Sequence, residues 1–204
     1  MALKLIEKGY GQLELNLVSF PRTGNIVAQY RAGETFVSDN SPLENGMLLK
    51  VDGKNRCVDK AAPAAGNIYA LNYSTEHMYD ERQYRLADFK LNPTDDFYPR
   101  LGYLSVGDKF TTNCICVYSE GEEDETAKIA NATAKEIADA WESIKVGFAG
   151  TEEQAAIELY GVASKFGYIK LATAIPTDGP VLRAIEITTM PDGQNAIKFE
   201  VIRA

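Results

Sequence analysis

Three runs of sequence decide the fold predicted for this chain: MLLKVDGKNRCV (47–58), IYALNYS (68–74) and YLSVGDKFTTNCICVY (103–118). Each run is short, rich in β-branched and aromatic residues, and bounded by Gly, Pro, Asn or Asp, which is typical of strands in a small antiparallel barrel or sandwich. Asp52-Gly53 lies inside the first run and predicts a hairpin turn, because a type I′ turn needs positive φ at both central residues. These runs therefore predict a β-rich N-terminal domain.

The chain before these runs predicts two more strands. GQLELNLVSF (11–20) alternates apolar and polar residues, and NIVAQYRAG (25–33) follows after a turn that contains Pro21 and Gly24. We expect these two strands to pair as a hairpin. The polar, turn-rich segment 33–46 is expected to be a surface connection with a short strand at 35–38.

The chain after these runs changes character at the acidic segment SEGEEDE (119–125). Residues 125–145 carry an apolar stripe at helical spacing that includes Trp141, and a second helix is expected from Thr151 to Phe166 with Gly167 as its C-terminal cap. A strand (168–175) and a hairpin (181–203) complete the pattern. The predicted fold is α+β: a β-barrel or sandwich domain (1–119), then a domain (120–204) of two helices packed on a three-stranded antiparallel sheet.

Composition excludes several classes of protein. The formal net charge is −8 and the pI is about 4.8, whereas a nucleic-acid binder needs clustered Lys and Arg. No apolar run reaches the roughly 18 residues that a membrane span needs, and the N-terminus lacks the apolar core of a signal peptide. We expect synthesis in a reducing cytoplasm, with no nucleic-acid or membrane partner.

The three cysteines are expected to be structural thiols. Cys114 and Cys116 form Cys-x-Cys within a predicted strand, so their side chains share a face. A metal site needs further Cys or His ligands, and His77 is the single histidine. Free cysteine is often buried as a small apolar side chain, and we assign this role to Cys57, Cys114 and Cys116.

Motifs of catalysis are missing from the sequence. It contains neither a Gly-rich phosphate loop nor a Gly-x-Ser-x-Gly elbow, and the carboxylate pairs Asp80/Glu81 and Asp95/Asp96 have no accompanying base or nucleophile. We therefore predict that the protein is not an enzyme and has no cofactor. The alternative is a cytoplasmic enzyme or small-ligand binder that uses a cleft between the two domains.

The long segment 75–100 is rich in aromatic residues and charges. Aromatic and Arg side chains are favoured as anchors of protein–protein interfaces, so this segment is predicted to face a partner. The alternative is that this segment is an ordinary long loop that packs on the barrel of its own domain. The candidate interface residues are Tyr79, Tyr84, Phe97, Tyr98 and Arg100.

The β-rich part follows one course: a Gly-led apolar strand, a tight turn, a Pro/Ala-rich stretch and another apolar strand. The residues that show it are Gly46–Asp52, Cys57-Val58, Ile68–Leu71 and Leu104–Asn113. In this course, residues 1–119 resemble capsid decoration proteins of tailed bacteriophages.

This resemblance implies a virion structural protein that stabilises the head. Its location would be the capsid surface after synthesis in the host cytoplasm. Its partners would be the major capsid protein or other virion subunits, and a homo-oligomer is compatible with this role. A tail or fibre component belongs to the same class.

Overall fold

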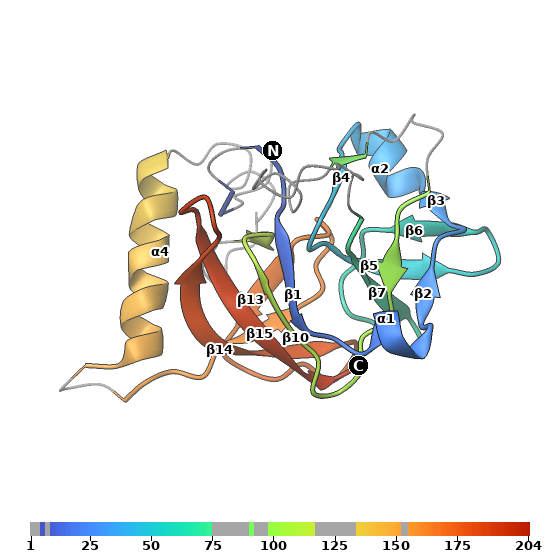
Figure 1. Ribbon diagram of the computed structural model, residues 1–204. Helices are drawn as coiled ribbons and strands as arrows, with labels where there is room; N and C mark the ends of the chain where they lie inside the picture. The colour runs from blue at the N-terminus through green and yellow to red at the C-terminus, as the bar shows by residue number, and fades with distance from the viewer. Residues whose placement is uncertain (1–4, 7–8, 75–89, 92–97, 117–133, 152–154) are drawn as a thin grey trace.

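The computed structural model describes residues 5–6, 9–74, 90–91, 98–116, 134–151 and 155–204. It is a mixed α and β structure (Figure 1) with two main sheets. The strands are β1 (Leu13–Leu17), β2 (Ile26–Val27), β3 (Arg31–Ala32), β4 (Leu43–Glu44), β5 (Leu48–Asp52), β6 (Cys57–Asp59), β7 (Ile68–Asn72), β8 (Lys90–Leu91), β9 (Leu101–Gly102), β10 (Lys109–Thr112), β11 (Ile115–Cys116), β12 (Tyr160–Val162), β13 (Ile169–Ala172), β14 (Val181–Thr189) and β15 (Asn195–Arg203). The helices are α1 (Phe20–Thr23), α2 (Glu34–Asp39) and α4 (Ala134–Ala149).

The larger sheet combines strands from both predicted domains. Its seven strands have the order β1-β10-β15-β14-β12-β13-β11, and neighbours are antiparallel except β11 and β13. Strand β10 pairs with β15 over Lys109↔Glu200 to Thr112↔Ile197. The predicted boundary at 119/120 lies outside the described residues and stays a prediction, but this sheet takes strands from both sides of it.

The smaller main sheet has six strands in the order β2-β9-β7-β5-β6-β3. Its outer strands β2 and β3 are joined by three residues, 28–30, so the sheet curls back toward itself. Strand β5 is buried on both faces: Leu48 packs in one hydrophobic cluster and Leu49 in the other. This double burial explains the nearly continuous apolar run from Met47 to Val51.

Two hydrophobic clusters hold the sheets together. The first gathers Phe110, Phe199 and Leu182 of the larger sheet with Leu48 and Leu71 of the smaller. The second includes Phe36 and Val58 together with Cys114, Cys116 and Tyr168. Figure 1 shows the larger sheet and α4 on one side of the molecule, and the smaller sheet with α1 and α2 on the other.

The hairpin predicted at Asp52-Gly53 is confirmed, but the predicted type I′ turn is wrong. Strands β5 and β6 pair with Asp52 opposite Cys57. The positive φ falls on Arg56, at 52°, and the Asp52 carboxylate accepts hydrogen bonds from the backbone N–H groups of Lys54 and Asn55, both at 3.0 Å. An aspartate side chain therefore closes this turn where a glycine in the left-handed region was expected.

The predicted pairing of 11–20 with 25–33 is wrong. Strand β1 pairs with β10, and β2 pairs with β9. Between β1 and β2 the chain forms the helical turn α1, which ends at Gly24 with φ of 75°. Phe20 of this turn is completely buried, and the chain passes here from one sheet to the other. The C-terminal hairpin is confirmed, since β14 and β15 pair from Val181↔Arg203 to Thr189↔Asn195.

Segment 33–46 contains a helix where a short strand was expected. Helix α2 covers Glu34–Asp39, with Phe36 completely buried and Val37 exposed. Asn40 ends the helix in the left-handed region with φ of 47°. The polar composition concealed this helix because a single aromatic side chain supplies its buried contact.

The first predicted C-terminal helix (125–145) is confirmed from residue 134 onward, its earlier part lies outside the described residues, and the second predicted helix is wrong. Helix α4 places Trp141 in the core and packs Ile144 and Phe148 against it, while Gly147 lies inside the helix and Gly150 follows its end. In the predicted second helix (151–166), the described residues contain strand β12 instead. Strand β12 separates β13 from β14, so the predicted three-stranded sheet is also wrong. Within the described ranges, none of the helices is long and apolar enough to cross a membrane.

Candidate functional site

Two of the five predicted interface residues can be placed. Tyr79, Tyr84 and Phe97 lie outside the described residues. Tyr98 is 40% exposed, and Arg100 is exposed with its backbone fixed: its N–H donates to Ser74 Oγ at 2.7 Å and its carbonyl accepts from Tyr73 N at 3.0 Å. Both placed residues are thus exposed, and the backbone of Arg100 is fixed by two hydrogen bonds.

Tyr98 is held by Arg31, which the sequence did not identify. The Arg31 Nε and Nη2 groups donate to Tyr98 Oη at 3.2 and 3.0 Å, and the guanidinium carbon lies 5.3 Å from the ring centroid. Arg31 is exposed and belongs to β3, an outer strand of the six-stranded sheet. The pair fixes an aromatic ring and a cation on β3, the last strand in the order of the six-stranded sheet.

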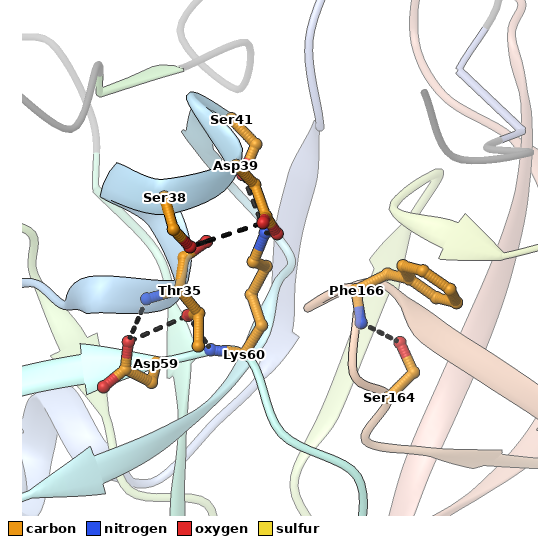
Figure 2. A network of polar contacts seen from close by, with 8 residues as sticks. All are labelled: Thr35, Ser38, Asp39, Ser41, Asp59, Lys60, Ser164 and Phe166. Carbon is orange, nitrogen blue, oxygen red and sulfur yellow. Dashed lines mark hydrogen bonds and ion pairs between the residues drawn. The ribbon is translucent and has the colours of Figure 1, made fainter. Parts of the chain in front are cut away.

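A second polar cluster fixes helix α2 on strand β6 (Figure 2). Lys60 Nζ lies 2.6 Å from Asp39 Oδ2, 2.8 Å from Ser41 Oγ and 5.1 Å from the centroid of the Phe36 ring. The Lys60 side chain is 6% exposed and that of Asp39 is 59% exposed. The hydrogen bond from Lys60 lowers the pKa of Asp39, so the Asp39 carboxylate is charged at neutral pH.

The other end of α2 is capped by Asp59 at the end of β6. Asp59 Oδ1 accepts hydrogen bonds from Thr35 N at 3.0 Å and from Thr35 Oγ1 at 2.8 Å. A carboxylate at a helix N-terminus satisfies an unpaired N–H group and complements the helix dipole. Asp59 and Lys60 are consecutive, so two adjacent residues hold both ends of α2. Because Lys60 is so deeply buried, we interpret this cluster as a structural clamp.

The turn 164–168 of the larger sheet packs against this clamp. Ser164 Oγ donates to the Tyr168 carbonyl at 2.6 Å and accepts from Phe166 N at 3.2 Å, and Figure 2 shows this turn opposite Lys60. Gly167 has φ of 81°, and a Cβ there would lie 3.2 Å from Lys60 Cγ. Leu48 N also donates to the Gly167 carbonyl at 3.0 Å. A glycine is thus required where the two sheets meet.

The expected burial of Cys114 and Cys116 is confirmed, but the expected single strand through both is wrong, because β10 ends at Thr112 and β11 begins at Ile115. Cys114 and Cys116 are buried and lie in the same hydrophobic cluster, whereas Cys57 is half-buried at the start of β6. Burial and the carboxylates of Asp59 and Asp52 raise the pKa of Cys57 to about 11, so its thiol is protonated and weakly nucleophilic at neutral pH. Among the residues that the structure describes, no group of three or more His, Cys, Asp or Glu side chains could hold a metal ion.

A groove of about 460 Å³ lies between the loop after β6 and the β12–β13 part of the larger sheet with the segment that follows β13. Pro63, from the loop after β6, forms part of one wall, and Ser164, Lys165 and Phe166 from the turn after β12 form part of the other. Lys170 of β13 and Asp178 also line it. This groove could not be predicted from the sequence, because residues about 100 positions apart in the chain meet only through the sheet order.

Comparisons of the chain with protein-family models, with curated proteins and with solved structures found no match.

Proposed function

We propose that this chain is a structural protein of a tailed-bacteriophage virion, a capsid decoration protein that stabilises the head. It binds the major capsid protein or another virion subunit through protein–protein contacts at the capsid surface. The protein acts by burying surface against its partner and by pairing strands with it, rather than by catalysis. The resemblance of residues 1–119 motivates the proposal, and one feature of the surface supports the mode of binding.

That feature is the Arg31–Tyr98 pair. Tyr and Arg are the residue types most enriched at energetic centres of interfaces. Each normally loses side-chain freedom on binding, at a cost of about 0.5–1.5 kcal/mol per side chain. Here the two hydrogen bonds and the stacking contact already restrict both side chains. An exposed ring that is ordered before binding lowers this entropic cost.

The position of the pair also suits an assembly contact. Arg31 lies on β3, which pairs with β6 and is the last strand in the order of the six-stranded sheet. Exposed strand edges offer backbone N–H and C=O groups to a partner strand. Tyr98 lies next to Pro99 and Arg100, where the described chain resumes after segment 92–97. We therefore assign the partner-facing surface to the edge of β3 and the end of segment 75–100.

The test is co-sedimentation of the purified protein with phage particles that lack it. The Tyr98→Ala and Arg31→Ala variants should each bind about 30-fold more weakly, which corresponds to about 2 kcal/mol at an interface centre. Arg183→Ala and Lys135→Ala are matched controls, since both residues are exposed on the larger sheet or on α4. They should bind within about twofold of the unmodified protein, as expected for residues outside an interface centre.

Circular dichroism and thermal unfolding of each variant will separate lost binding from lost folding. Unchanged binding by both folded variants of the pair contradicts the assignment of this surface. A failure of the unmodified protein to bind any particle contradicts the virion function itself.

A further inference from the structure

Three aspartates of this chain are followed directly by glycine: Asp52-Gly53, Asp178-Gly179 and Asp192-Gly193. In such a pair the amide nitrogen of glycine can attack the carboxyl carbon of aspartate, because glycine has no side chain to obstruct the ring that forms. The product of this attack is isoaspartate, in which the main chain runs through the aspartate side chain. The structure distinguishes the three pairs by how firmly each carboxylate is held.

The Asp52 carboxylate is held in its turn. It accepts hydrogen bonds from the backbone N–H groups of Lys54 and Asn55, both at 3.0 Å, and from Asn55 Nδ2 at 2.8 Å. The backbone hydrogen bond from Asn55 lowers the pKa of Asp52, so this group is ionised at neutral pH. An ionised carboxylate is a poor electrophile, because its negative charge reduces the positive character of the carbon. This pair is therefore protected.

The Asp192 carboxylate is held in the same way. It accepts from Gln194 N at 3.1 Å and from the side-chain amides of Gln194 and Gln12 at 2.6 and 2.8 Å. Burial alone would raise the pKa of Asp192, but the hydrogen bonds from Gln194 and Gln12 outweigh it and lower the pKa. The nitrogen of this pair is engaged too, since Gly193 N donates to the Met190 carbonyl at 2.8 Å.

Asp178-Gly179 has weaker restraints. Within the described residues, the Asp178 carboxylate accepts one hydrogen bond, from the hydroxyl of the adjacent Thr177 at 3.2 Å, and Gly179 N donates none. Asp178 lines two grooves, of about 460 and 380 Å³, which give water access to it. Both reacting groups of this pair are thus less restrained than those of the other two.

The fold requires glycine beside Asp178. Gly179 has φ of 73°, in the left-handed region that favours glycine, and a Cβ there would lie 3.1 Å from Pro63 Cβ. Conformation and space both exclude a larger residue. The reactive pair is therefore a consequence of how this loop packs against the loop after β6.

We propose that Asp178-Gly179 is a modification site at which the folded protein converts aspartate to isoaspartate. Gly179 N attacks Asp178 Cγ, a C–N bond forms, and the amide proton leaves with the carboxyl hydroxyl group as water, which gives a five-membered succinimide. Water then opens the ring. Cleavage at the main-chain carbonyl of Asp178 gives isoaspartate, and cleavage at Cγ restores aspartate. The inference goes beyond the proposed virion function and uses different residues.

The modification should loosen the C-terminal end of β15. Isoaspartate lengthens the main chain by one methylene group between residues 178 and 179. Arg203 donates hydrogen bonds to the carbonyls of Pro176, Asp178 and Gly179 at 2.8, 3.0 and 2.8 Å. A longer main chain moves these carbonyls relative to one another, so Arg203 loses part of its anchoring. We expect the isomerised protein to unfold at a lower temperature than the unmodified protein.

The test is incubation of the full-length protein at neutral pH with mild warming, followed by peptide mapping. Electron-transfer fragmentation in the mass spectrometer distinguishes isoaspartate from aspartate at equal mass. Isoaspartate should form at residue 178 at least about tenfold faster than at residue 52 or 192, which corresponds to about 1.4 kcal/mol in the barrier. In concentrated urea the three pairs should react at similar rates, because the hydrogen bonds that protect two of them are lost.

Asp178→Glu is the matched control. It keeps the carboxylate, but its ring would have six members and closes far more slowly. Incubation of this variant should produce no modification at residue 178, and the fall in unfolding temperature should disappear. Circular dichroism before incubation shows whether the variant is folded as the unmodified protein is.

Two outcomes overturn the proposal. One is equal or faster formation of isoaspartate at residue 52 or 192 in the folded protein. The other is no isoaspartate at residue 178 of the folded protein by the time the unfolded chain has formed it there. Neither measurement involves phage particles, so a failure here leaves the virion function untouched, and a failure to bind particles has no bearing on this site.

Discussion

Tyr168 Oη donates a 2.9 Å hydrogen bond to Glu44 Oε1 across 124 positions of the chain. Glu44 is completely buried, and its other oxygen accepts a 2.7 Å hydrogen bond from Gly11 N. One carboxylate thus joins the N-terminal segment, the end of β4 and the start of β13. Buried carboxylates persist in proteins when several hydrogen bonds satisfy them, and this one joins β4 to segments that precede two strands of the larger sheet, β1 and β13.

Removal of the Tyr168 hydroxyl should therefore be costly. We expect Tyr168→Phe to lower the free energy of unfolding by about 1.5–3 kcal/mol, the range for hydrogen bonds to charged groups. The matched control is Tyr69→Phe, because Tyr69 Oη donates to the uncharged carbonyl of Ala62 at 2.6 Å. That change should cost about 0.5–1.5 kcal/mol in urea unfolding. Equal losses for the two variants contradict the importance of the buried carboxylate.

The same pair predicts a dependence of stability on alkaline pH. Burial, and then the negative charge of Glu44, raise the pKa of Tyr168 in the folded protein. Its contribution is complete below the unfolded pKa of about 10 and is lost as pH rises above that value. Relative to Tyr168→Phe, the unmodified protein should lose about 1.4 kcal/mol of stability per pH unit above about pH 10. Parallel curves for the two proteins in that range would falsify this prediction.

Gly161→Ala tests the strand that replaced a predicted helix. A Cβ at Gly161 would lie 2.7 Å from Ile169 Cγ2 and 2.9 Å from Phe199 Cε1. Overpacking of this kind should destabilise the protein by about 1–3 kcal/mol. If residues 151–166 were a helix, alanine would instead stabilise it by up to about 1 kcal/mol. Gly53→Ala is the control, because its Cβ would lie 3.4 Å from Tyr30 Oη, an ordinary contact, and its φ is not positive.

The Lys60–Asp39 ion pair should respond asymmetrically to substitution. Asp39→Asn leaves a buried ammonium group without its charged partner, so we expect a loss of about 1–2 kcal/mol, below the cost at a fully buried pair. Lys60→Met replaces the buried stem with an apolar one and leaves a carboxylate that is 59% exposed, so the loss should stay below about 1 kcal/mol. Thermal unfolding of both variants and of the double variant measures this order. A larger loss for Lys60→Met contradicts the clamp as described.

Cys57 should react slowly with alkylating agents. Its pKa of about 11 leaves little thiolate at neutral pH, so the rate of iodoacetamide labelling should rise about tenfold per pH unit until about pH 11. Intact-mass spectrometry counts the labels. Cys114 and Cys116 are buried and should be labelled only after unfolding. A rate that stops rising near pH 8.5 indicates an ordinary exposed thiol.

Local patterns predicted the elements whose environment is simple. The hairpin of β14 and β15 alternates cleanly, and α4 carries the apolar stripe of a helix that covers a core. The segment 151–166 was wrongly predicted to be a helix because Leu159, Val162 and Phe166 recur at helical spacing. The sequence Tyr160-Gly161-Val162 indicates a strand instead, since β-branched and aromatic residues favour strands and Gly weakens a helix.

The pairing of strands that are distant in the chain could not be predicted from the sequence. Nothing local to β1 specifies β10 as its partner, because the register Leu13↔Thr112 depends on how the sheet assembles. The same holds for the candidate site. Tyr98 could be predicted from its residue type. The role of Arg31 could not, because it depends on the approach of β3 to residue 98.

The proposed virion function requires a tailed phage that encodes this chain, and its most direct test is quantitative mass spectrometry of purified particles of such a phage. We predict that the chain is present in many copies per particle, in a fixed ratio to the major capsid protein. Dissociation of the particles with mild denaturant should release the unmodified chain later than the Tyr98→Ala variant. Particles that lack the chain, while it accumulates in the soluble fraction of infected cells, contradict the account.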